Sequence, residues 1–257
     1  KYPSPRKTGI VYADEVEEYA EEESVEDYPV HLFLSREGYF KKITPNSLRM
    51  SGEQKFKEND GLRQRMEAKN KDELLIFTDR QQVYKARVWE FEDTKASALG
   101  VYLPSHLNMD EGESVIAMIN PGDYSREIVL FYENGKAARL PLGVYATKAN
   151  RRRLTGAYSD KSPLKSVIFL DGDREVAVFS TEGRALIFST ALLAPKTSRT
   201  VQGVSVMNLK KKYKLSEAKP VEETSIKNLS RYRVRNIPAA GALLKEEDRG
   251  EEQLTLI

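Results

Sequence analysis

The stretch IVLFYENGKAARLPL, residues 128–142, contains the repeating unit of this chain. An apolar run ends at a tight polar turn, Asn134-Gly135, and a second run that carries basic residues follows it. Asn-Gly between two such runs is a strong β-hairpin signal, because glycine readily adopts the positive φ that the turn requires. The stretch therefore predicts two antiparallel strands joined at Gly135.

Three more copies of this hairpin pattern occur along the chain. They are HLFLSREGYFKKI (31–43), LLIFTDRQQVYKARV (74–88) and VAVFSTEGRALIFST (176–190). The last apolar residues before the four turns are spaced by 43, 54 and 48 residues, and they are Leu34, Phe77, Phe131 and Phe179.

Three of the four turns have glycine at the same position. Gly38 and Gly183 match Gly135, whereas the second copy has Gln81. We therefore expect the turn of the second copy to differ from the others.

A second glycine follows each turn by 23, 19, 21 and 20 residues, at Gly61, Gly100, Gly156 and Gly203. Further apolar strands are expected after three of them, at SVIAMI (114–119), SVIFL (166–170) and VSVMNL (204–209). Four-stranded units repeated every 40–50 residues or so are typical of propeller blades. The sequence thus predicts an all-β, propeller-like body with four clear blades. A fifth blade would have to be completed by the terminal segments, with a strand and an extended segment in 228–244.

The composition excludes several classes of protein. The chain has 257 residues, 40% of them hydrophobic, so it can bury a substantial core and is not disordered throughout. No apolar run approaches the length of a membrane span, and no signal peptide opens the chain. Cys is absent, which removes disulfides, thiolate metal sites and Cys nucleophiles. We expect a cytoplasmic, nucleoid-associated protein with no membrane contact.

The small net charge of +2 conceals a strong asymmetry. Residues 14–27 hold nine acids and no base, and residues 246–252 add five acids. Residues 28–244 hold 36 bases against 25 acids, so the body carries an excess of 11 positive charges. Such an excess predicts a polyanionic partner, most commonly nucleic acid.

The chain resembles the C-terminal domain of the A subunits of bacterial type IIA topoisomerases, namely DNA gyrase and topoisomerase IV. The resemblance covers essentially the whole chain. It rests on KYPSPRKT (1–8), the acidic stretch after it, LSREGYFKKITPNSLR (34–49), the four hairpins in register, and TVQGV (200–204).

The resemblance implies a β-pinwheel, a propeller-like ring whose blades exchange outer strands and whose basic rim binds duplex DNA. It implies a linker from the cleavage core plus the acidic segment in 1–29, the DNA-binding pinwheel in 30–244, and a polar tail in 245–257. The parent enzyme uses ATP and Mg²⁺, works with a B subunit and a second A subunit, and has its nucleophilic Tyr upstream. By this resemblance the domain itself has no catalytic residue and no cofactor, and in isolation it is monomeric.

One segment departs from the gyrase pattern. Gyrase has the heptapeptide Gln-Arg-Arg-Gly-Gly-Lys-Gly in its first blade, whereas GEQKFKENDGL (52–62) stands at that place here. Gln54, Lys55 and Gly61 match, and Glu58 and Asp60 add negative charge. This departure favours a topoisomerase IV-like protein over a gyrase that wraps DNA, and the closing segment from residue 231 also resembles topoisomerase IV tails.

The candidate DNA contacts are the bases on and after each hairpin. Cations repeated once per blade would match the regular phosphates of a curved duplex without reading its sequence. We expect the Arg and Lys triplets among them to lie on one connected basic surface. The candidates are Lys41, Lys42, Arg49, Lys55, Lys57, Lys85, Arg87, Lys95, Lys136, Arg139, Lys148, Arg151, Arg152, Arg153, Arg184, Lys196, Arg199, Lys210, Lys211 and Lys212.

Other chemistry has little support in the sequence. His31 and His106 are the only histidines, and neither has metal-ligand spacing. The acids of LDGDRE (170–175) fit a turn between blades better than an acid/base pair. A propeller that binds protein partners remains a second function, which would make the basic rim incidental.

Overall fold

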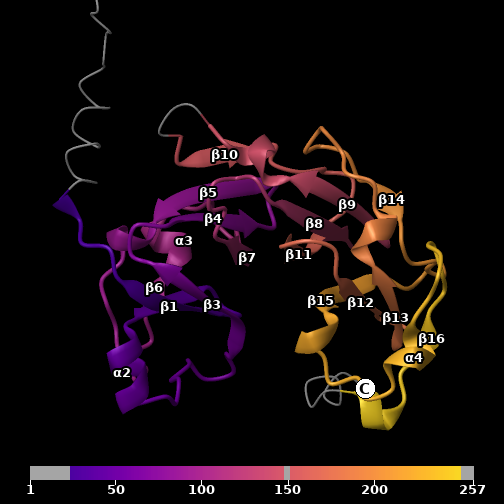
Figure 1. Ribbon diagram of the computed structural model, residues 1–257, viewed down its shortest axis with the longest axis horizontal. Helices are drawn as coiled ribbons and strands as arrows, with labels where there is room; N and C mark the ends of the chain where they lie inside the picture. The colour runs from indigo at the N-terminus through magenta and orange to yellow at the C-terminus, as the bar shows by residue number, and fades with distance from the viewer. Residues whose placement is uncertain (1–23, 148–150, 250–257) are drawn as a thin grey trace, which may run out of the picture.

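The computed structural model describes residues 24–147 and 151–249. In these residues, four antiparallel sheets of four strands each form four blades. Figure 1 shows the blades following one another around an arch, from the indigo N-terminal blade to the yellow C-terminal blade. The predicted all-β, propeller-like fold is therefore confirmed.

The first two blades have the strand orders β3-β1-β2-β6 and β10-β5-β4-β7. Blade 1 contains β1 (Pro29–Ser35), β2 (Tyr39–Ile43), β3 (Leu62–Lys69) and β6 (Val101–Tyr102). Blade 2 contains β4 (Glu73–Thr78), β5 (Gln82–Arg87), β7 (Val115–Ile119) and β10 (Arg153–Thr155).

The last two blades have the orders β11-β8-β9-β14 and β15-β12-β13-β16. Blade 3 contains β8 (Glu127–Tyr132), β9 (Lys136–Pro141), β11 (Leu164–Leu170) and β14 (Val204–Ser205). Blade 4 contains β12 (Glu175–Ser180), β13 (Arg184–Ser189), β15 (Leu215–Pro220) and β16 (Ala242–Leu243).

Short helical turns connect the strands. The α-helical turns are α2 (Pro45–Met50), α3 (Leu103–His106) and α4 (Leu229–Tyr232). The 3-10 turns are η1 (Val88–Glu90), η2 (Leu142–Tyr145), η3 (Thr190–Leu192), η4 (Val221–Glu223) and η5 (Glu246–Asp248).

All four predicted hairpins are present, and the same position of each turn has a positive φ. Gly38, Gly135 and Gly183 have φ values of +90°, +79° and +75°. Gln81 has φ +54° and so adopts the same left-handed conformation, but its turn differs as expected in its hydrogen bond: the glycine N–H groups donate to the carbonyl three residues earlier, whereas Gln81 N–H donates to Tyr158 Oη. The blade around it holds this residue in place, because the Gln81 N–H donates to Tyr158 Oη (3.1 Å) and its carbonyl accepts from Ala157 N–H (2.9 Å).

The outermost strand of each of the first three blades comes from the chain of the next blade. β6, β10 and β14 lie in sequence between the hairpin and the inner strand of blades 2, 3 and 4. In blade 4 this place is taken by β16, from the C-terminal segment. Among the described residues there is accordingly no fifth blade, and 228–244 forms α4 and β16.

Two of the four predicted landmark glycines lead into exchanged strands. A Cβ on Gly100 or Gly203 would come within 2.2 Å of Phe40 O or 1.8 Å of Ala137 O, so only glycine allows this close approach. Gly61 instead precedes the inner strand β3, and Gly156 follows β10.

Strands occur at all three predicted sites. The segments 114–119 and 166–170 contain the inner strands β7 and β11, whereas 204–209 begins with the two-residue exchanged strand β14, and the inner strand of blade 4 is β15. The strands β3 and β15 were missed because LRQRMEAK and LSEAKP are too polar to read as apolar strands. Both strands line the centre of the arch, where polar side chains are accommodated.

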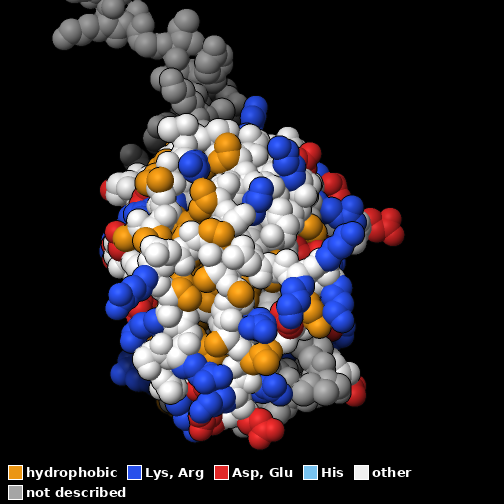
Figure 2. All heavy atoms as spheres, turned by 90° about the vertical axis from the view of Figure 1, so that its right-hand side faces the viewer, with side chains coloured by type: hydrophobic (Ala, Val, Ile, Leu, Met, Phe, Trp, Pro, Cys, Tyr) orange, Lys and Arg blue, Asp and Glu red, His pale blue; other side chains and the backbone are white. Residues whose placement is uncertain are grey.

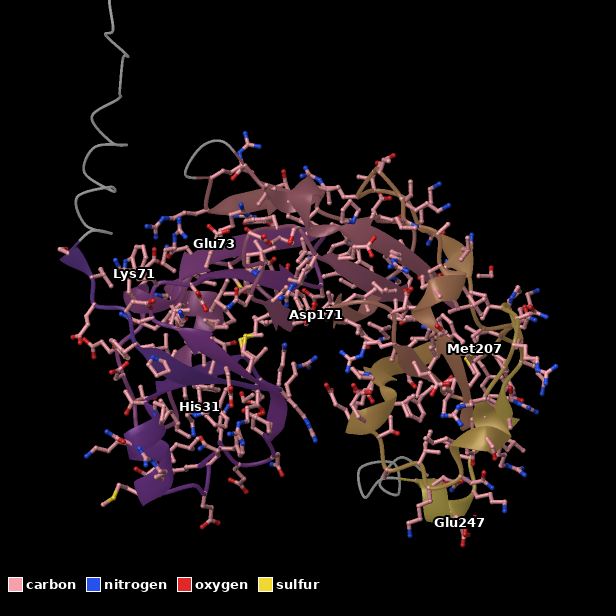
Figure 3. The ribbon with its side chains drawn as sticks, in the orientation of Figure 1. His31, Lys71, Glu73, Asp171, Met207 and Glu247 are labelled. Atoms are coloured by element: carbon pink, nitrogen blue, oxygen red, sulfur yellow. The ribbon has the colours of Figure 1, made fainter. Side chains whose placement is uncertain are left out.

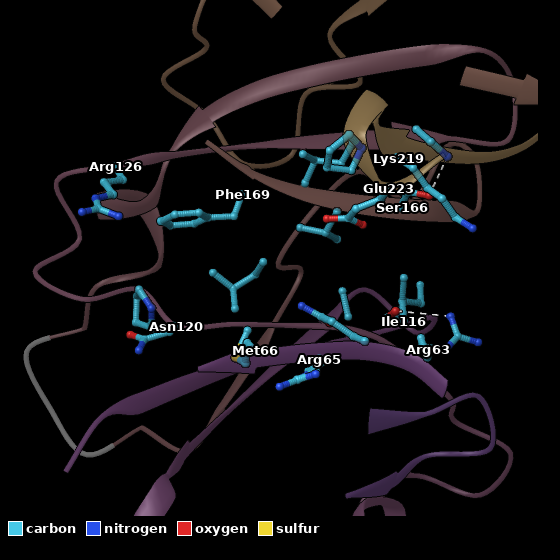
Figure 4. Close-up of a pocket in the computed structure, with 18 of the residues that line it drawn as sticks. Arg63, Arg65, Met66, Ile116, Asn120, Arg126, Ser166, Phe169, Lys219 and Glu223 are labelled. Carbon is cyan, nitrogen blue, oxygen red and sulfur yellow. Dashed lines mark hydrogen bonds between the residues drawn. The ribbon is translucent and has the colours of Figure 1, made fainter. Parts of the chain in front are cut away.

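Four inner strands surround a central cavity of about 1040 Å³. Figure 4 shows Arg63 and Arg65 projecting from β3 and Lys219 lying across the cavity. Gln64 joins blades 1 and 2 there, because its side-chain amide donates to Met118 O (2.7 Å) and accepts from Met118 N–H (3.0 Å). The Gln64 side chain thereby satisfies both backbone groups of Met118, as a neighbouring strand would otherwise do.

Apolar clusters fill the spaces between blades. Leu32 and Ile76 lie in the cluster between blades 1 and 2, and Phe131 and Phe188 in the cluster between blades 3 and 4. The end blades have small clusters of their own. Phe33 packs in the cluster with Leu48 of α2, and the outer face of blade 4 is covered by the C-terminal segment.

Candidate nucleic-acid interface

Three predicted DNA contacts occupy one equivalent position in blades 1 to 3, four residues after the turn. Lys42 lies 3.0 Å from Asp93, Lys85 donates to Tyr124 Oη (2.9 Å) and faces Glu73, and Arg139 pairs with Glu127 and Asp173. Their side chains are only 4%, 10% and 12% exposed. These cations hold the blades together, and none of them is available to a duplex.

Lys41 is also an internal group. It is 2% exposed, and its Nζ donates to Lys55 O (2.6 Å) and Ala96 O (2.9 Å). Burial lowers the pKa of Lys41. It fixes the loop that contains Lys55 against the segment that leads to β6.

Arg153 fastens the exchanged strand β10 to the other strands of blade 2. Its guanidinium binds Asp110 and Gln82 and lies 5.5 Å from the Tyr84 ring centre. Arg153 pairs with Tyr84, three residues after the turn of blade 2. In blades 1 and 3 the equivalent position of the exchanged strand is taken by Gly100 and Gly203. The third member of the arginine triplet is therefore engaged within the protein.

Several other candidates have partners within the protein. Arg199 donates to Gly156 O (3.1 Å), Arg184 donates to Gly241 O (3.0 Å), and Arg87 lies 3.7 Å from Glu73. Lys57 pairs with Glu37 at 2.9 Å, and Arg49 donates to Asn46. Lys136 is half-buried, Lys55 and Arg151 are exposed, and Lys148 lies outside the described residues.

A row of cations, three of them exposed and one half-buried, follows the outer edges of the blades. In blades 1, 3 and 4 the arriving chain donates to the strand residue four positions after the turn: Thr94 N–H to Lys42 O, Lys196 N–H to Arg139 O, and Val234 N–H to Ile187 O. In blade 2 the direction is reversed, because the strand residue Lys85 donates its N–H to Arg152 O of the arriving chain. The cations at or beside these contacts, which we call the outer-edge row, are Lys95, Arg152, Lys196 and Arg235.

The outer-edge row is largely free of acids. Lys95, Lys196 and Arg235 make no ion pair with any described residue, and Arg152, 73% exposed, lies 3.1 Å from Glu90. Figure 2 views the rim from the blade 4 side and shows Lys and Arg side chains gathered along both edges of that face. Each blade thus has one of these cations at or beside the backbone contact on its outer edge.

The lysine triplet lies elsewhere. Lys210–Lys212 forms part of a tight turn between β14 and β15, where Tyr213 N–H donates to Lys210 O (2.8 Å). Lys210 pairs with Glu182, which belongs to the β12–β13 turn. The triplet is therefore on the hairpin-turn face of blade 4, and the two basic runs do not share one sheet edge.

A family model and several curated proteins are similar in sequence to this chain. The family model described as the DNA gyrase C-terminal domain, a β-propeller, matches residues 72–120 and 174–222. The A subunit of DNA topoisomerase 4 from Staphylococcus epidermidis is 27% identical over 186 residues, which are 70% of this chain and 23% of that protein. The same protein from Staphylococcus aureus is 26% identical over 216 residues, covering 82% and 27%.

Two solved structures have the same fold. The C-terminal domain of DNA topoisomerase IV aligns with a TM-score of 0.64 and 24% identity, over 78% of this chain and 64% of that one. The DNA gyrase A C-terminal domain aligns with a TM-score of 0.56 and 17% identity, over 86% and 80%. These matches make the chain similar to the C-terminal domains of type IIA topoisomerase A subunits.

The chain spans about a quarter of the length of the curated relatives it matches. Segment 52–61 is an irregular loop before β3. Asp60 organises the end of that loop by accepting from the N–H groups of Glu37 (3.0 Å) and Gly61 (2.7 Å). Asp60 therefore has a structural role in this loop.

The remaining polar candidates have structural roles. His31 is 15% exposed, and the His106 ring stacks on Phe91 with centres 4.8 Å apart. Asp171 and Asp173 lie in the turn between β11 and β12, as predicted, where they pair with Arg126 and Arg139. Within residues 24–147 and 151–249 no group of acids and histidines could hold a metal ion. No described helix is long and apolar enough to cross a membrane.

Sequence reasoning missed Arg235 as a member of the basic surface. The signal was present in NLSRYRVR (228–235), which has three arginines and no acid. Its relation to the other blades became visible only through the backbone contact of Val234 with β13.

Proposed function

We propose that this domain binds duplex DNA along the outer-edge row and bends it, as a non-catalytic part of the A subunit of a type IIA topoisomerase. The observation that carries the proposal is that each of four successive blades has a cation at or beside the backbone contact on its outer edge, with Lys95, Arg152 and Arg235 exposed and Lys196 half-buried. Regularly spaced phosphates would meet these cations one after another, because the arch is convex on that side. Binding would be indifferent to base sequence, since such contacts read the backbone alone.

The parent enzyme would change DNA topology with ATP and Mg²⁺, which other parts of the assembly would bind. Its partners would be a B subunit and a second A subunit, joined through parts of the enzyme outside this domain. We favour topoisomerase IV-like bending over gyrase-like wrapping, because segment 52–62 has only scattered positive charge and includes Glu58 and Asp60. The alternative remains a gyrase whose domain wraps DNA.

The first test neutralises one surface at a time. The row variant Lys95→Gln, Arg152→Gln, Lys196→Gln, Arg235→Gln is compared with the turn-face variant Lys210→Gln, Lys211→Gln, Lys212→Gln. We expect the row variant to lose most of the affinity for a duplex of about 40 base pairs and the turn-face variant to lose much less. Equal losses would contradict a path along the outer edges.

The second test distinguishes bending from wrapping. Nicked plasmid is ligated with increasing amounts of the domain, and the linking number of the closed product is measured. We expect little or no shift. A large positive shift would support gyrase-like chiral wrapping, and salt-independent weak binding would favour a propeller that serves protein partners.

A further inference from the structure

The C-terminal segment does for blade 4 what the next blade does for the others. β16 pairs with β13 at Ala242↔Ala185, as β14 pairs with β9 at Val204↔Ala137. Gly241 precedes β16 with φ +70°, and a Cβ there would come within 2.6 Å of Ala185 O. The chain thus ends the row of blades with a substitute for an exchanged strand.

The same segment also covers the free face of blade 4. Ile226, Tyr232 and Leu244 form one apolar cluster with Phe179 and Ile187 of the blade. We call residues 224–249 the C-terminal cap. It takes the place on this face that a neighbouring blade takes elsewhere in the arch.

Asp248 fastens the C-terminal cap from within. It is 1% exposed, and its carboxylate accepts from Tyr232 Oη (2.7 Å) and from the N–H groups of Lys227 (2.8 Å) and Asn228 (3.2 Å). Tyr232 Oη in turn accepts from Lys245 N–H (3.2 Å). Both ends of the cap therefore meet at one buried carboxylate, and Figure 3 shows its neighbour Glu247 at the free end of the arch.

Arg235 belongs to the C-terminal cap that Asp248 fastens. It lies three residues beyond the buried Tyr232, and Val234 N–H holds its backbone to Ile187 O at 2.8 Å. The Arg235 side chain is exposed at the fourth place of the outer-edge row. No other described segment supplies the edge of blade 4.

We propose that Asp248 is a positioning residue of the nucleic-acid surface: by fastening the C-terminal cap, it holds Arg235 in the outer-edge row. With the cap docked, the basic surface extends over four blades. With the cap released, it ends at blade 3. The inference rests on the proposed function, because it concerns the same surface.

The experiment uses Asp248→Asn, Arg235→Gln and the double variant, with hydrogen exchange and duplex binding measured on each. In Asp248→Asn we expect the amides of Val234 and Leu244 to lose protection by about tenfold or more, while those of β8 and β9 keep theirs. Arg235→Gln should leave protection unchanged. Both single variants should lower the slope of log affinity against log salt by about 0.9, and the double variant should lower it no further.

The outcomes separate this inference from the proposed function. Loss of cap protection with an unchanged salt slope would overturn the role of Asp248, and so would an additive double variant. If the unmodified domain fails to bind duplex DNA, the proposed function fails, whatever the exchange data show.

A second variant guards against misfolding of Asp248→Asn. Gly241→Ala obstructs β16 directly, and Gly172→Ala is its control, since it has positive φ (+91°) but nothing within 4 Å of the added carbon. We expect Gly241→Ala to reproduce the loss of cap protection and of salt slope, and Gly172→Ala to reproduce neither. A normal salt slope in Gly241→Ala despite a released cap would overturn the proposal.

Discussion

Lys42, Lys85 and Arg139 show how one residue type serves two purposes in this domain. They are basic residues on basic hairpins, yet each is buried beside an acid: Asp93, Glu73 and Asp173 respectively. A buried cation is tolerated only when it is paired and hydrogen-bonded, which these three are. Their contribution to the positive net charge therefore overstates the charge offered to a duplex.

Gln81 gives a prediction at the residue scale. It is a non-glycine residue at φ +54°, a conformation that costs about 1–2 kcal/mol for residues with a Cβ. Gln81→Gly should raise the free energy of unfolding by about 0.5–1 kcal/mol, since greater freedom of the unfolded chain offsets part of the relief. Urea unfolding measures the change. Gly183→Gln is the reverse control and should destabilise, and a destabilised Gln81→Gly would contradict the argument.

Asp248 gives a second residue-scale prediction. Burial alone would raise its pKa, but hydrogen bonds from Tyr232 and from the N–H groups of Lys227 and Asn228, with Lys245 nearby, hold the pKa of Asp248 below its usual value. A depressed pKa means that this stabilisation is fully present above the ordinary Asp pKa of about 3.9 and is lost as pH falls through the folded-state pKa.

The measurement is the Tm of the domain and of Asp248→Asn between pH 2 and pH 6. The difference between them should be largest near pH 6 and should shrink below about pH 4. A difference independent of pH would show that the carboxylate charge is not what fastens the cap.

At the scale of elements, the exchanged strands β6, β14 and β16 are only two residues long. Two residues of pairing would not hold a strand by themselves. The strand must therefore also be stabilised by the close backbone approach at the preceding glycine and by the apolar clusters between blades. The requirement for glycine is greatest at Gly203, where a Cβ would lie 1.8 Å from Ala137 O.

Gly203→Ala should therefore destabilise the domain by about 2–4 kcal/mol, because it combines steric overlap with a strained positive φ. Gly172→Ala has a positive φ without the overlap and should cost only about 1 kcal/mol. Thermal and urea unfolding of both variants measure the difference. Equal destabilisation by the two variants would mean that β14 can shift to accommodate the added Cβ without loss of stability.

At the scale of the whole molecule, the arch needs no closure because each end blade covers its own outer face. Leu48 of α2 packs beside Phe33 in blade 1, and the C-terminal cap covers Phe179 in blade 4. This is the solution that repeat proteins use, in which terminal units differ from internal ones to shield the last apolar face.

Affinity for DNA should accordingly show strong dependence on salt. With about 6–10 phosphate contacts, affinity should fall by roughly 10³–10⁵ between about 50 and 200 mM salt. Fluorescence anisotropy of a labelled duplex measures it, and duplexes of different sequence should give similar slopes. A flat salt dependence would contradict a surface made of cations.

The sequence by itself determined the repeat, the four hairpins and the family resemblance. Alternating apolar strands and glycine turns are local signals, and a resemblance depends only on the order of residues. The excess of basic charge was also visible, because charge is a sum over the chain.

Only the tertiary structure decided which cations face outward and which strands complete each blade. Lys42 and Lys95 look alike in sequence, but one is buried beside Asp93 and the other is exposed. Strand exchange, the pairing of β16 with β13 and the burial of Asp248 all join residues far apart in the chain. Such contacts depend on how the blades pack against one another, so no local pattern of residues could reveal them.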